Sequence, residues 1–480
     1  MSCPPRQRVS STGHSPASAK RPGPTPGTAL AVALLVVVAV PRANSPPDIL
    51  EARVDRYVKP YVDSRNFSGV VLVARDGRPI VRLAYGFANV ELAVPNRPET
   101  KFHIASVSKT FTAAAVLLLQ QQGRLDVRDP VSRHLPGYPN GDRLTLHHLL
   151  THTSGIPNVN NLPDYDERAR FRQALPDIVR WFRDRPLEFE PGARYSYSNS
   201  NYNLLALVIE RASGEAYGSY LQSRILDPLG LSSTGHDEDV ERVIPGMASG
   251  YVPEGQAGVR RAPFLDWSVK TGNGSLYSTV DDLLRWTRAV RAPGLFASRT
   301  LEQMFTEHVD GVGYGWFIRK DPRRTVAMTG RSPGFSASLE QSVEDDVTVI
   351  LVSNLYSSVT QTMAGDVLAM AFGEDRVPLV PAVPVRVPVS RLDQYVGVYQ
   401  FGGDFTFNPG LVVRVEREGD ALRMVGSGGM GTSYLIALSG DRFLDRLYGG
   451  YVTFSAVASD EASEMRWNFG RDFTARRQPR

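Results

Sequence analysis

The chain has 480 residues, of which 42% are hydrophobic and 22% are charged, a composition that excludes collagen-like and wholly disordered proteins. Five bases and no acids lie in the first 45 residues, which leaves 49 bases against 50 acids in the rest of the chain. The net charge of +4 therefore belongs to the N-terminal segment, and a nucleic-acid-binding face is not indicated. Cys3 is the single cysteine, so the sequence beyond it can form no disulfide, thiolate metal site or cysteine nucleophile.

The N-terminal segment resembles an export signal. Residues 29–40 are twelve consecutive apolar residues that follow a basic stretch and precede small residues. A membrane-spanning helix needs roughly 20 such residues, so the run is short for an anchor. We predict a leader over residues 1–45 and a periplasmic or secreted protein. An uncleaved leader that anchors the chain in a membrane through residues 29–40 is the alternative.

The part of the chain after residue 45 has strand patterns near its beginning and near its end. Strands are predicted over residues 69–75, 79–85, 325–329, 336–341 and 347–352. Helical patterns lie between them, over residues 110–122, 144–150, 171–183, 202–212 and 280–290. Thr279 precedes the last helix and can cap it together with Asp282. This order predicts an α/β (α+β) domain over residues 46–375, in which an antiparallel sheet with adjacent first and last strands is packed by helices.

The composition changes after Phe372. Residues 376–390 alternate Pro and Val, which is typical of a semi-extended linker. Short strand patterns with turn residues between them then follow, at 395–399, 411–415, 421–425, 434–438, 451–454 and 464–469. We predict a small all-β sheet or barrel over residues 391–480. The arginines of the last ten residues are interpreted as a solvated end.

The strongest local motif is Ser106 followed by Lys109 at the start of an apolar helix. A serine at a helix N-terminus lies near free backbone N–H groups and the positive end of the helix dipole, which suit a developing oxyanion. Lys109 lies one turn further along, on the same face, where it can reach the hydroxyl. Burial by the apolar helix would lower the pKa of the lysine and make it a usable base. A capping serine followed by a solvated lysine is the plainer interpretation of the same spacing.

Two further motifs favour the catalytic interpretation. Tyr197-Ser198-Asn199 precedes a helix, and Thr329-Gly330 follows in a later strand. This order resembles the serine β-lactamase and penicillin-binding-protein superfamily, in particular its class C-like branch with esterases and D-aminopeptidases. The similarity runs from about residue 50 to residue 372. The resemblance implies a β-lactamase/transpeptidase-like fold, and it implies that the C-terminal β domain is of the lipocalin-like kind.

The resemblance also implies roles for these residues. Ser106 would be the acylated nucleophile, Lys109 and Tyr197 would form the base pair, and Asn199 would hold the substrate. The backbone N–H groups of Ser106 and Arg331 would form the oxyanion hole.

The third motif departs from the family pattern. The family usually has Lys or His, then Thr, Ser or Gly, then Gly, whereas this chain has Met328, Thr329 and Gly330, followed by Arg331. A thioether offers no positive charge to a substrate carboxylate. We therefore expect neutral esters to be favoured over penicillins and D-alanyl peptides.

Other residues could be mistaken for parts of the site. Lys270-Thr271-Gly272 matches the third motif literally, but it precedes a Gly-Asn-Gly turn, so the Lys270 side chain need not face the cleft. His148 and His152 have the spacing of a ligand pair, but a third ligand is missing, and we interpret them as structural. No metal and no organic cofactor are expected.

The predicted function is that of a serine hydrolase that cleaves an ester or amide through an acyl-serine intermediate, with an esterase-like preference. The expected partner is a small ester, amide or peptide substrate, and the oligomeric state is left open. A β-lactamase or D-Ala-D-Ala carboxypeptidase is the enzymatic alternative. A non-catalytic binding or scaffold relative of the same fold is the alternative from another class.

Overall fold

The structure of the chain is a computed structural model that describes residues 47–320, 323–380, 385–405, 410–427, 431–455, 461–468 and 471–479. The predicted leader and its apolar run lie outside these ranges. No helix within them has the length and apolar character needed to cross a membrane. The described residues belong to one compact unit of the chain.

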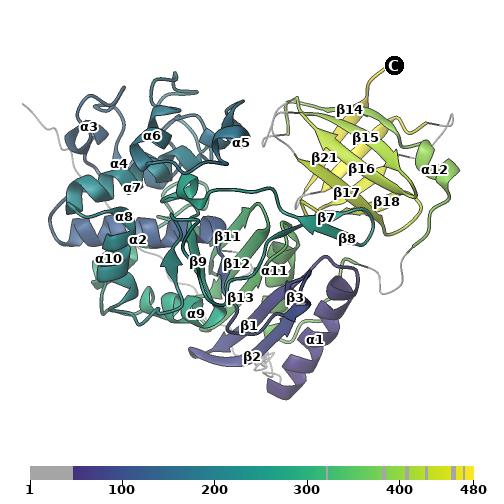
Figure 1. The fold of residues 1–480 in the computed structure, drawn as a ribbon, viewed down its shortest axis with the longest axis horizontal. Coiled ribbons are helices and arrows are strands. Elements are labelled where there is room, and N and C mark those ends of the chain that lie inside the picture. Colours follow the sequence, from purple (N-terminus) through teal and green to yellow (C-terminus); the bar gives the residue numbers. More distant parts are fainter. Residues whose placement is uncertain are drawn as a thin grey trace, which may run out of the picture. The chain divides into compact units, whose positions relative to one another are not determined.

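A six-stranded antiparallel sheet forms the centre of the first part (Figure 1). Its strands are, in spatial order, β10 (Phe317–Arg319), β11 (Thr325–Ser332), β12 (Phe335–Ser342), β13 (Val347–Ser353), β1 (Gly69–Arg75) and β2 (Arg78–Tyr85). Strand β1 pairs with β13 along its whole length, from Gly69 opposite Ser353 to Arg75 opposite Val347. The predicted meeting of the first and last strands is confirmed.

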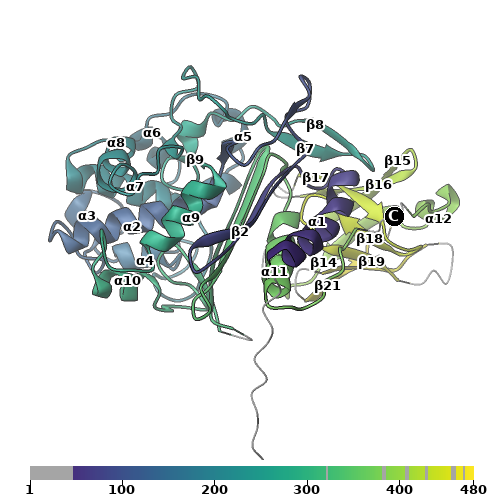
Figure 2. The same cartoon turned by 90° about the horizontal axis from the view of Figure 1, so that it is seen from below.

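Helices cover both faces of this sheet (Figure 2). On one side lie α2 (Ser108–Gln121), α7 (Asn199–Ser213) and α9 (Val280–Ala289), and on the other lie α1 (Pro47–Asp63) and α11 (Val359–Ala371). Side chains alternate along each strand, so Val70 and Leu72 enter the first apolar core, whereas Val71 and Val73 enter the second. The sheet is therefore buried on both faces, and the larger helical layer carries the candidate site.

Shorter elements complete this layer. They are α3 (Val131–His134), α4 (Leu146–Leu150), α5 (Tyr165–Arg168), α6 (Leu175–Arg180), α8 (Tyr217–Leu221) and α10 (Ser298–Met304). Small sheets are formed by β3 (Phe87–Asn89) with β4 (Val94–Pro95), by β5 (Phe102–His103), β9 (Leu276–Ser278) and β6 (Gly235–His236), and by β7 (Tyr251–Glu254) with β8 (Gly258–Arg261).

Local chemistry explains where several helices begin. The helix predicted over residues 171–183 is shorter, because Pro176 lies in the first turn of α6, where its fixed φ suits a helix start. Helix α4 begins after Thr145, whose hydroxyl accepts a hydrogen bond from the backbone N–H of His148. Thr279 caps α9 by accepting from the N–H of Asp282, as predicted.

The C-terminal part is a closed eight-stranded barrel, which confirms the predicted small all-β domain. Its strands are β14 (Gly397–Phe401), β15 (Val412–Glu418), β16 (Ala421–Gly426), β17 (Thr432–Ala437), β18 (Arg442–Asp445), β19 (Tyr451–Phe454), β20 (Glu464–Asn468) and β21 (Asp472–Arg477). Strands β18 and β21 were not predicted, and β21 closes the barrel against β14. The predicted solvated tail is thus partly a strand, in which the Arg477 guanidinium donates hydrogen bonds to the carbonyls of Gln394 and Ala462.

The turn after β18 joins the barrel to the first part of the chain. Arg446 is fully buried and donates hydrogen bonds to the side-chain oxygen of Asn66 and to the carbonyls of Glu254 and Gly258. Ile436 and Leu444 enter the same apolar cluster as side chains of α1 and α11. Since a buried guanidinium is costly unless its donors are paired, these contacts fix the turn in place.

Candidate active site

Ser106 lies in a 3₁₀ turn, Ala105–Val107, that leads directly into α2. Ala105 has a φ of +46°, a left-handed conformation that is strained for a residue with a Cβ atom. Ser106 remains partly exposed, whereas Ala105 and Val107 are fully buried. The turn therefore presents one hydroxyl to solvent at the N-terminal end of an apolar helix.

Lys109 is the buried partner of this serine. Its side chain is fully buried, and its Nζ lies 3.0 Å from Ser106 Oγ, 2.8 Å from Asn199 Oδ1 and 2.6 Å from the carbonyl oxygen of Asn273. On the other side of the serine, Tyr197 Oη lies 2.8 Å from Ser106 Oγ. The structure thus brings together Ser106, Lys109, Tyr197 and Asn199, which the sequence analysis had selected from distant segments.

Electrostatics sets the protonation of these groups. Burial, and secondarily the charge of Lys270, hold the pKa of Lys109 well below its usual range, which favours the neutral amine in the folded site. Burial raises the pKa of Tyr197 to about 12, against a smaller opposing effect of its hydrogen bond to Ser106. Tyr197 is therefore a phenol at neutral pH.

The hydrogen-bond partners of Lys109 define what each of its protonation states can do. As an ammonium, Lys109 donates to Ser106 Oγ, Asn199 Oδ1 and the Asn273 carbonyl oxygen. A neutral amine has two N–H donors and one lone pair. Asn199 Oδ1 and the Asn273 carbonyl can only accept, so in the neutral state they take both donors and leave the lone pair for the Ser106 hydroxyl. In that state Ser106 Oγ can accept from the Tyr197 phenol, which lies 2.8 Å away.

Asn199 is held in place by a second 3₁₀ turn, Val159–Asn161. Its side-chain amide donates to Asn160 Oδ1 at 2.7 Å, and its backbone N–H donates to Asn158 Oδ1 at 3.0 Å. These contacts orient its Oδ1 toward Lys109. Asn158, Asn160 and Asn273 were not found from the sequence, since asparagines in loops carry no spacing signal of their own.

His152 packs behind the tyrosine rather than forming a metal site. Its ring lies 4.5 Å from the Tyr197 ring between centroids, and its Nδ1 accepts from the backbone N–H of Ser198. Burial lowers its pKa to about 3, so the imidazole is neutral. His148 uses its Nδ1 to accept from the N–H of Thr145. Over the described ranges, no group of three residues could hold a metal ion.

Strand β11 forms one wall of the site. Gly330 packs so closely on the serine turn that a Cβ atom there would lie 2.3 Å from the Ile104 carbonyl oxygen and 2.8 Å from the Ser106 nitrogen. Beyond Ala327, the last β11 residue paired with β10, the free edge of the strand runs past this turn. The backbone of β11 is thus close to the N–H group that would face an oxyanion.

The side chains of Met328, Thr329 and Arg331, the other residues of the third motif, lie in three different surroundings. Met328 is 3% exposed and belongs to the apolar core, and Thr329 is partly exposed. The Arg331 side chain points to the barrel, where its guanidinium donates to the Leu447 carbonyl at 2.8 Å and covers the Tyr448 ring. Its contribution near Ser106 is therefore limited to the backbone.

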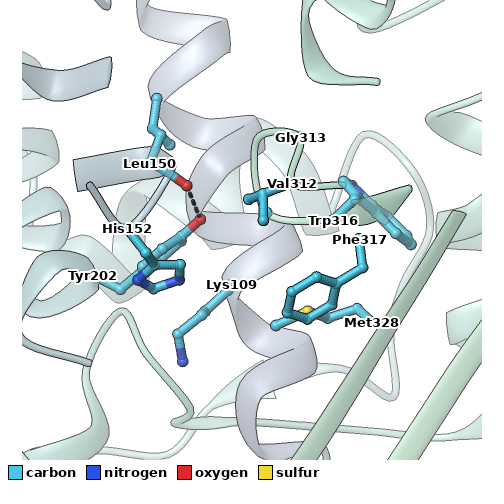
Figure 3. A pocket seen from close by; sticks show the side chains of 10 residues that line it. Lys109, Leu150, His152, Tyr202, Val312, Gly313, Trp316, Phe317 and Met328 are labelled. Carbon is cyan, nitrogen blue, oxygen red and sulfur yellow. Dashed lines mark hydrogen bonds between the residues drawn. The ribbon is translucent and has the colours of Figure 1, made fainter. Parts of the chain in front are cut away.

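A small cavity of about 10 Å³ lies beside the stem of Lys109, room for about one water molecule. Figure 3 shows Lys109 between His152 and Tyr202 on one side and Met328 and Phe317 on the other. Met328 therefore makes the wall beside the lysine apolar. No charged group from β11 competes with Lys109 at this position.

Lys270 lies closer to the site than the sequence analysis expected. It ends the 3₁₀ turn Trp267–Lys270 and is 6% exposed. Its charge helps to lower the pKa of Lys109, and the loop that follows supplies the Asn273 carbonyl to the same amine. The loop is held against α7 by the Asn203 amide, which donates to the Thr271 carbonyl at 2.8 Å. Lys270 thus begins the loop that contacts Lys109, and this loop is separate from β11.

The protonation states predict the pH dependence of turnover. The base must be neutral, so kcat/KM for a neutral ester should rise with pH through the lowered pKa of Lys109 and level off well below pH 10.5. Tyr197, with its pKa raised to about 12, should cause no fall below about pH 11. A pH-rate profile measures both the rise that Lys109 causes and the absence of a fall from Tyr197. A rate that still climbs steeply at pH 10 would show a lysine with its ordinary pKa.

Comparisons with known proteins show which proteins this chain is similar to. The family model described as Beta-lactamase matches residues 54–371. Penicillin-binding protein 4* of Bacillus subtilis is 30% identical over 316 residues, which cover 61% of this chain and 69% of that protein. A crystal structure of a penicillin-binding protein from Bacillus halodurans is 27% identical, covers 65% of this chain and 97% of that chain, and has a TM-score of 0.58. The octameric penicillin-binding protein homologue from Pyrococcus abyssi, 24% identical, covers 89% of this chain and 99% of that chain with a TM-score of 0.61.

Proposed function

Because the chain belongs to the β-lactamase family of serine hydrolases, we propose that it hydrolyses an ester or amide through an acyl intermediate on Ser106. One observation carries the proposal: Nζ of the fully buried Lys109, whose pKa is held well below its usual range, lies 3.0 Å from the partly exposed Ser106 hydroxyl and can accept its proton when neutral. A binding protein of the same fold would need no such base. The order Tyr197–Ser106–Lys109 supports acyl transfer rather than simple binding.

Acylation starts with attack of Ser106 Oγ on the substrate carbonyl carbon. The hydroxyl proton moves to Lys109 Nζ as the new bond forms. The carbonyl oxygen becomes negative, and the backbone N–H groups of Ser106 and Arg331 stabilise it. The leaving oxygen or nitrogen then takes a proton as its bond to the carbon breaks, either directly from Lys109 or from the Tyr197 phenol, which Lys109 reprotonates, so that in both cases the amine becomes neutral.

Deacylation repeats these steps with water as the nucleophile. The amine, neutral again after the leaving group has gone, accepts a proton from the attacking water. Ser106 Oγ leaves as the acyl group is released, and it recovers its proton from the same pair of groups. Asn199 keeps the amine oriented throughout, because its Oδ1 accepts one of the N–H groups.

Trapping of the intermediate tests the proposal. The protein is mixed with a p-nitrophenyl ester, quenched in acid and digested, and the mass of each peptide is measured. We expect the acyl mass on the peptide that contains Ser106. Release of p-nitrophenol without an acylated peptide, or an acyl group on another serine, would contradict the proposed intermediate.

The apolar wall at β11 supports an esterase-like preference. An ion pair with a substrate carboxylate contributes ~1.5–3 kcal/mol, and Met328 cannot form one. We therefore expect kcat/KM for neutral short-chain esters to exceed that for benzylpenicillin or acyl-D-Ala-D-Ala. Met328→Lys should narrow this gap by roughly tenfold or more, whereas Met328→Leu should not. Steady-state kinetics on both substrate classes measures the gap, and thermal melting checks that each variant folds.

The β-lactamase or carboxypeptidase alternative makes the opposite prediction. It requires wild-type kcat/KM for benzylpenicillin or acyl-D-Ala-D-Ala to match or exceed that for the neutral esters. That result would mean that the carboxylate is bound elsewhere than at position 328.

A further inference from the structure

The ammonium group of Lys270 has no counter-ion among the residues that the structure describes. Within the ranges that the structure describes, no hydrogen bond or ion pair joins it to another residue, although the residue as a whole is 6% exposed. Its nearest recorded partner is the face of the Tyr165 ring, whose centroid lies 5.1 Å from Nζ. Asp266, which begins the same turn, caps it by accepting from the backbone N–H of Ser268, and within the described ranges it forms no ion pair with Lys270.

An unpaired, largely buried cation is costly to keep. The aromatic face offsets part of this cost, since it attracts a cation without supplying a negative charge. Nζ of Lys270 is not fully enclosed by the protein, so it retains access to solvent. The group is thus preorganised to meet an anion that comes from outside.

The position of this cation links it to the site. Lys270 is near enough for its charge to act on Lys109, and its backbone carbonyl accepts from the N–H groups of Asn273 and Gly274. The Asn273 carbonyl in turn accepts from Lys109 Nζ. Gly272 packs against Tyr202, which lies on the opposite side of Lys109 from Met328 (Figure 3). The loop that begins at Lys270 therefore packs against α7 and contacts Lys109 directly.

We propose that Lys270 is a specificity-determining residue that binds an anionic group, such as a carboxylate, on the substrate of Ser106. This inference rests on the proposed acyl-serine hydrolysis and adds the substrate class. It is compatible with an apolar wall at Met328, because Met328 belongs to β11, whereas Lys270 ends the 3₁₀ turn Trp267–Lys270 and lies over the Tyr165 ring. A substrate that fits both the apolar wall at Met328 and the Lys270 cation would be an ester whose negative group is directed toward Tyr165.

Two matched pairs of esters test the proposal. In the first pair the acyl chain carries the charge: mono-p-nitrophenyl adipate is compared with its methyl ester. In the second pair the leaving group carries it: 4-acetoxybenzoate is compared with its methyl ester. The quantity measured is the ratio of kcat/KM for the charged member to that for the neutral member, after subtraction of hydrolysis without protein.

We expect Lys270→Met to lower this ratio by about tenfold to a hundredfold in at least one pair. Lys270→Arg should keep most of the wild-type ratio of kcat/KM for the charged ester to that for the neutral ester, because the positive charge remains. Lys59→Met is the matched control, since Lys59 lies exposed on α1, and it should leave both ratios as in the wild type. Thermal melting of each variant separates a folding defect from a change in selectivity.

The outcomes separate this inference from the function on which it rests. Hydrolysis of the neutral esters with equal ratios in the wild type and Lys270→Met would overturn the role of Lys270 and leave acyl-serine hydrolysis standing. Absence of ester hydrolysis together with absence of an acylated Ser106 would overturn both. A ratio that falls in Lys270→Arg as far as in Lys270→Met would also contradict the proposal, because charge would not be the cause.

Discussion

Ser106→Ala should abolish ester hydrolysis, with a fall in turnover on the order of 10⁴-fold or more. The substitution removes the only atom that can form the acyl bond and leaves Lys109 and Tyr197 without the oxygen between them. It should also abolish covalent labelling by a fluorophosphonate. Because the serine is partly exposed and lies in a turn, the melting temperature should change by only a few degrees.

Ser108→Ala is the matched control for this prediction. Ser108 is fully buried, and its hydroxyl accepts a hydrogen bond from the backbone N–H of Leu276. Its removal should cost stability of about 1 kcal/mol and leave labelling in place. Labelling that persists in Ser106→Ala and maps to Ser108 would show that the nucleophile has been misassigned.

The fold was predictable where the sequence repeats a pattern over many residues. Residues 69–75 alternate between two apolar cores, and the predicted strand matches β1 from end to end. Strand β21 was missed because Asp472–Arg477 is polar on its outer face and the strand exists only through its pairing with β14 and β20. Long-range pairing of a polar strand leaves no local signal.

The residues of the site likewise divide into those with a recognisable sequence signal and those placed only by long-range contacts. Ser106, Lys109 and Tyr197 could be selected because their spacing and order match a known family, and the family assignment is confirmed. Asn273 acts through its carbonyl oxygen, which every residue possesses, so no side-chain pattern can indicate it. Lys270 was set aside because it precedes a Gly-Asn-Gly turn, from which its side chain need not face the cleft. The hydrogen bonds that fold this loop against α7 join segments far apart in the sequence.

Lys109→Met and Tyr197→Phe should each lower turnover by roughly 10²–10⁴-fold. Methionine fills the buried space of the lysine stem but cannot accept the serine proton, and phenylalanine keeps the ring but removes the donor to Ser106. Tyr195→Phe is the matched control for the second variant. Tyr195 packs on the same His152 and has no recorded contact with Ser106, so its variant should keep nearly wild-type turnover.

The double variant decides whether the two groups act as one unit. Tyr197, Ser106 and Lys109 form a single chain of proton donors and acceptors, so breaking it at one end already deprives the serine of its activation. Lys109→Met combined with Tyr197→Phe should therefore be little slower than the worse single variant, since groups that act together lose activity non-additively. Kinetics of all four proteins on one neutral ester measures the coupling. Losses that simply multiply would mean that the lysine and the tyrosine serve separate steps, with Lys109 removing the serine proton and Tyr197 acting only on the leaving group.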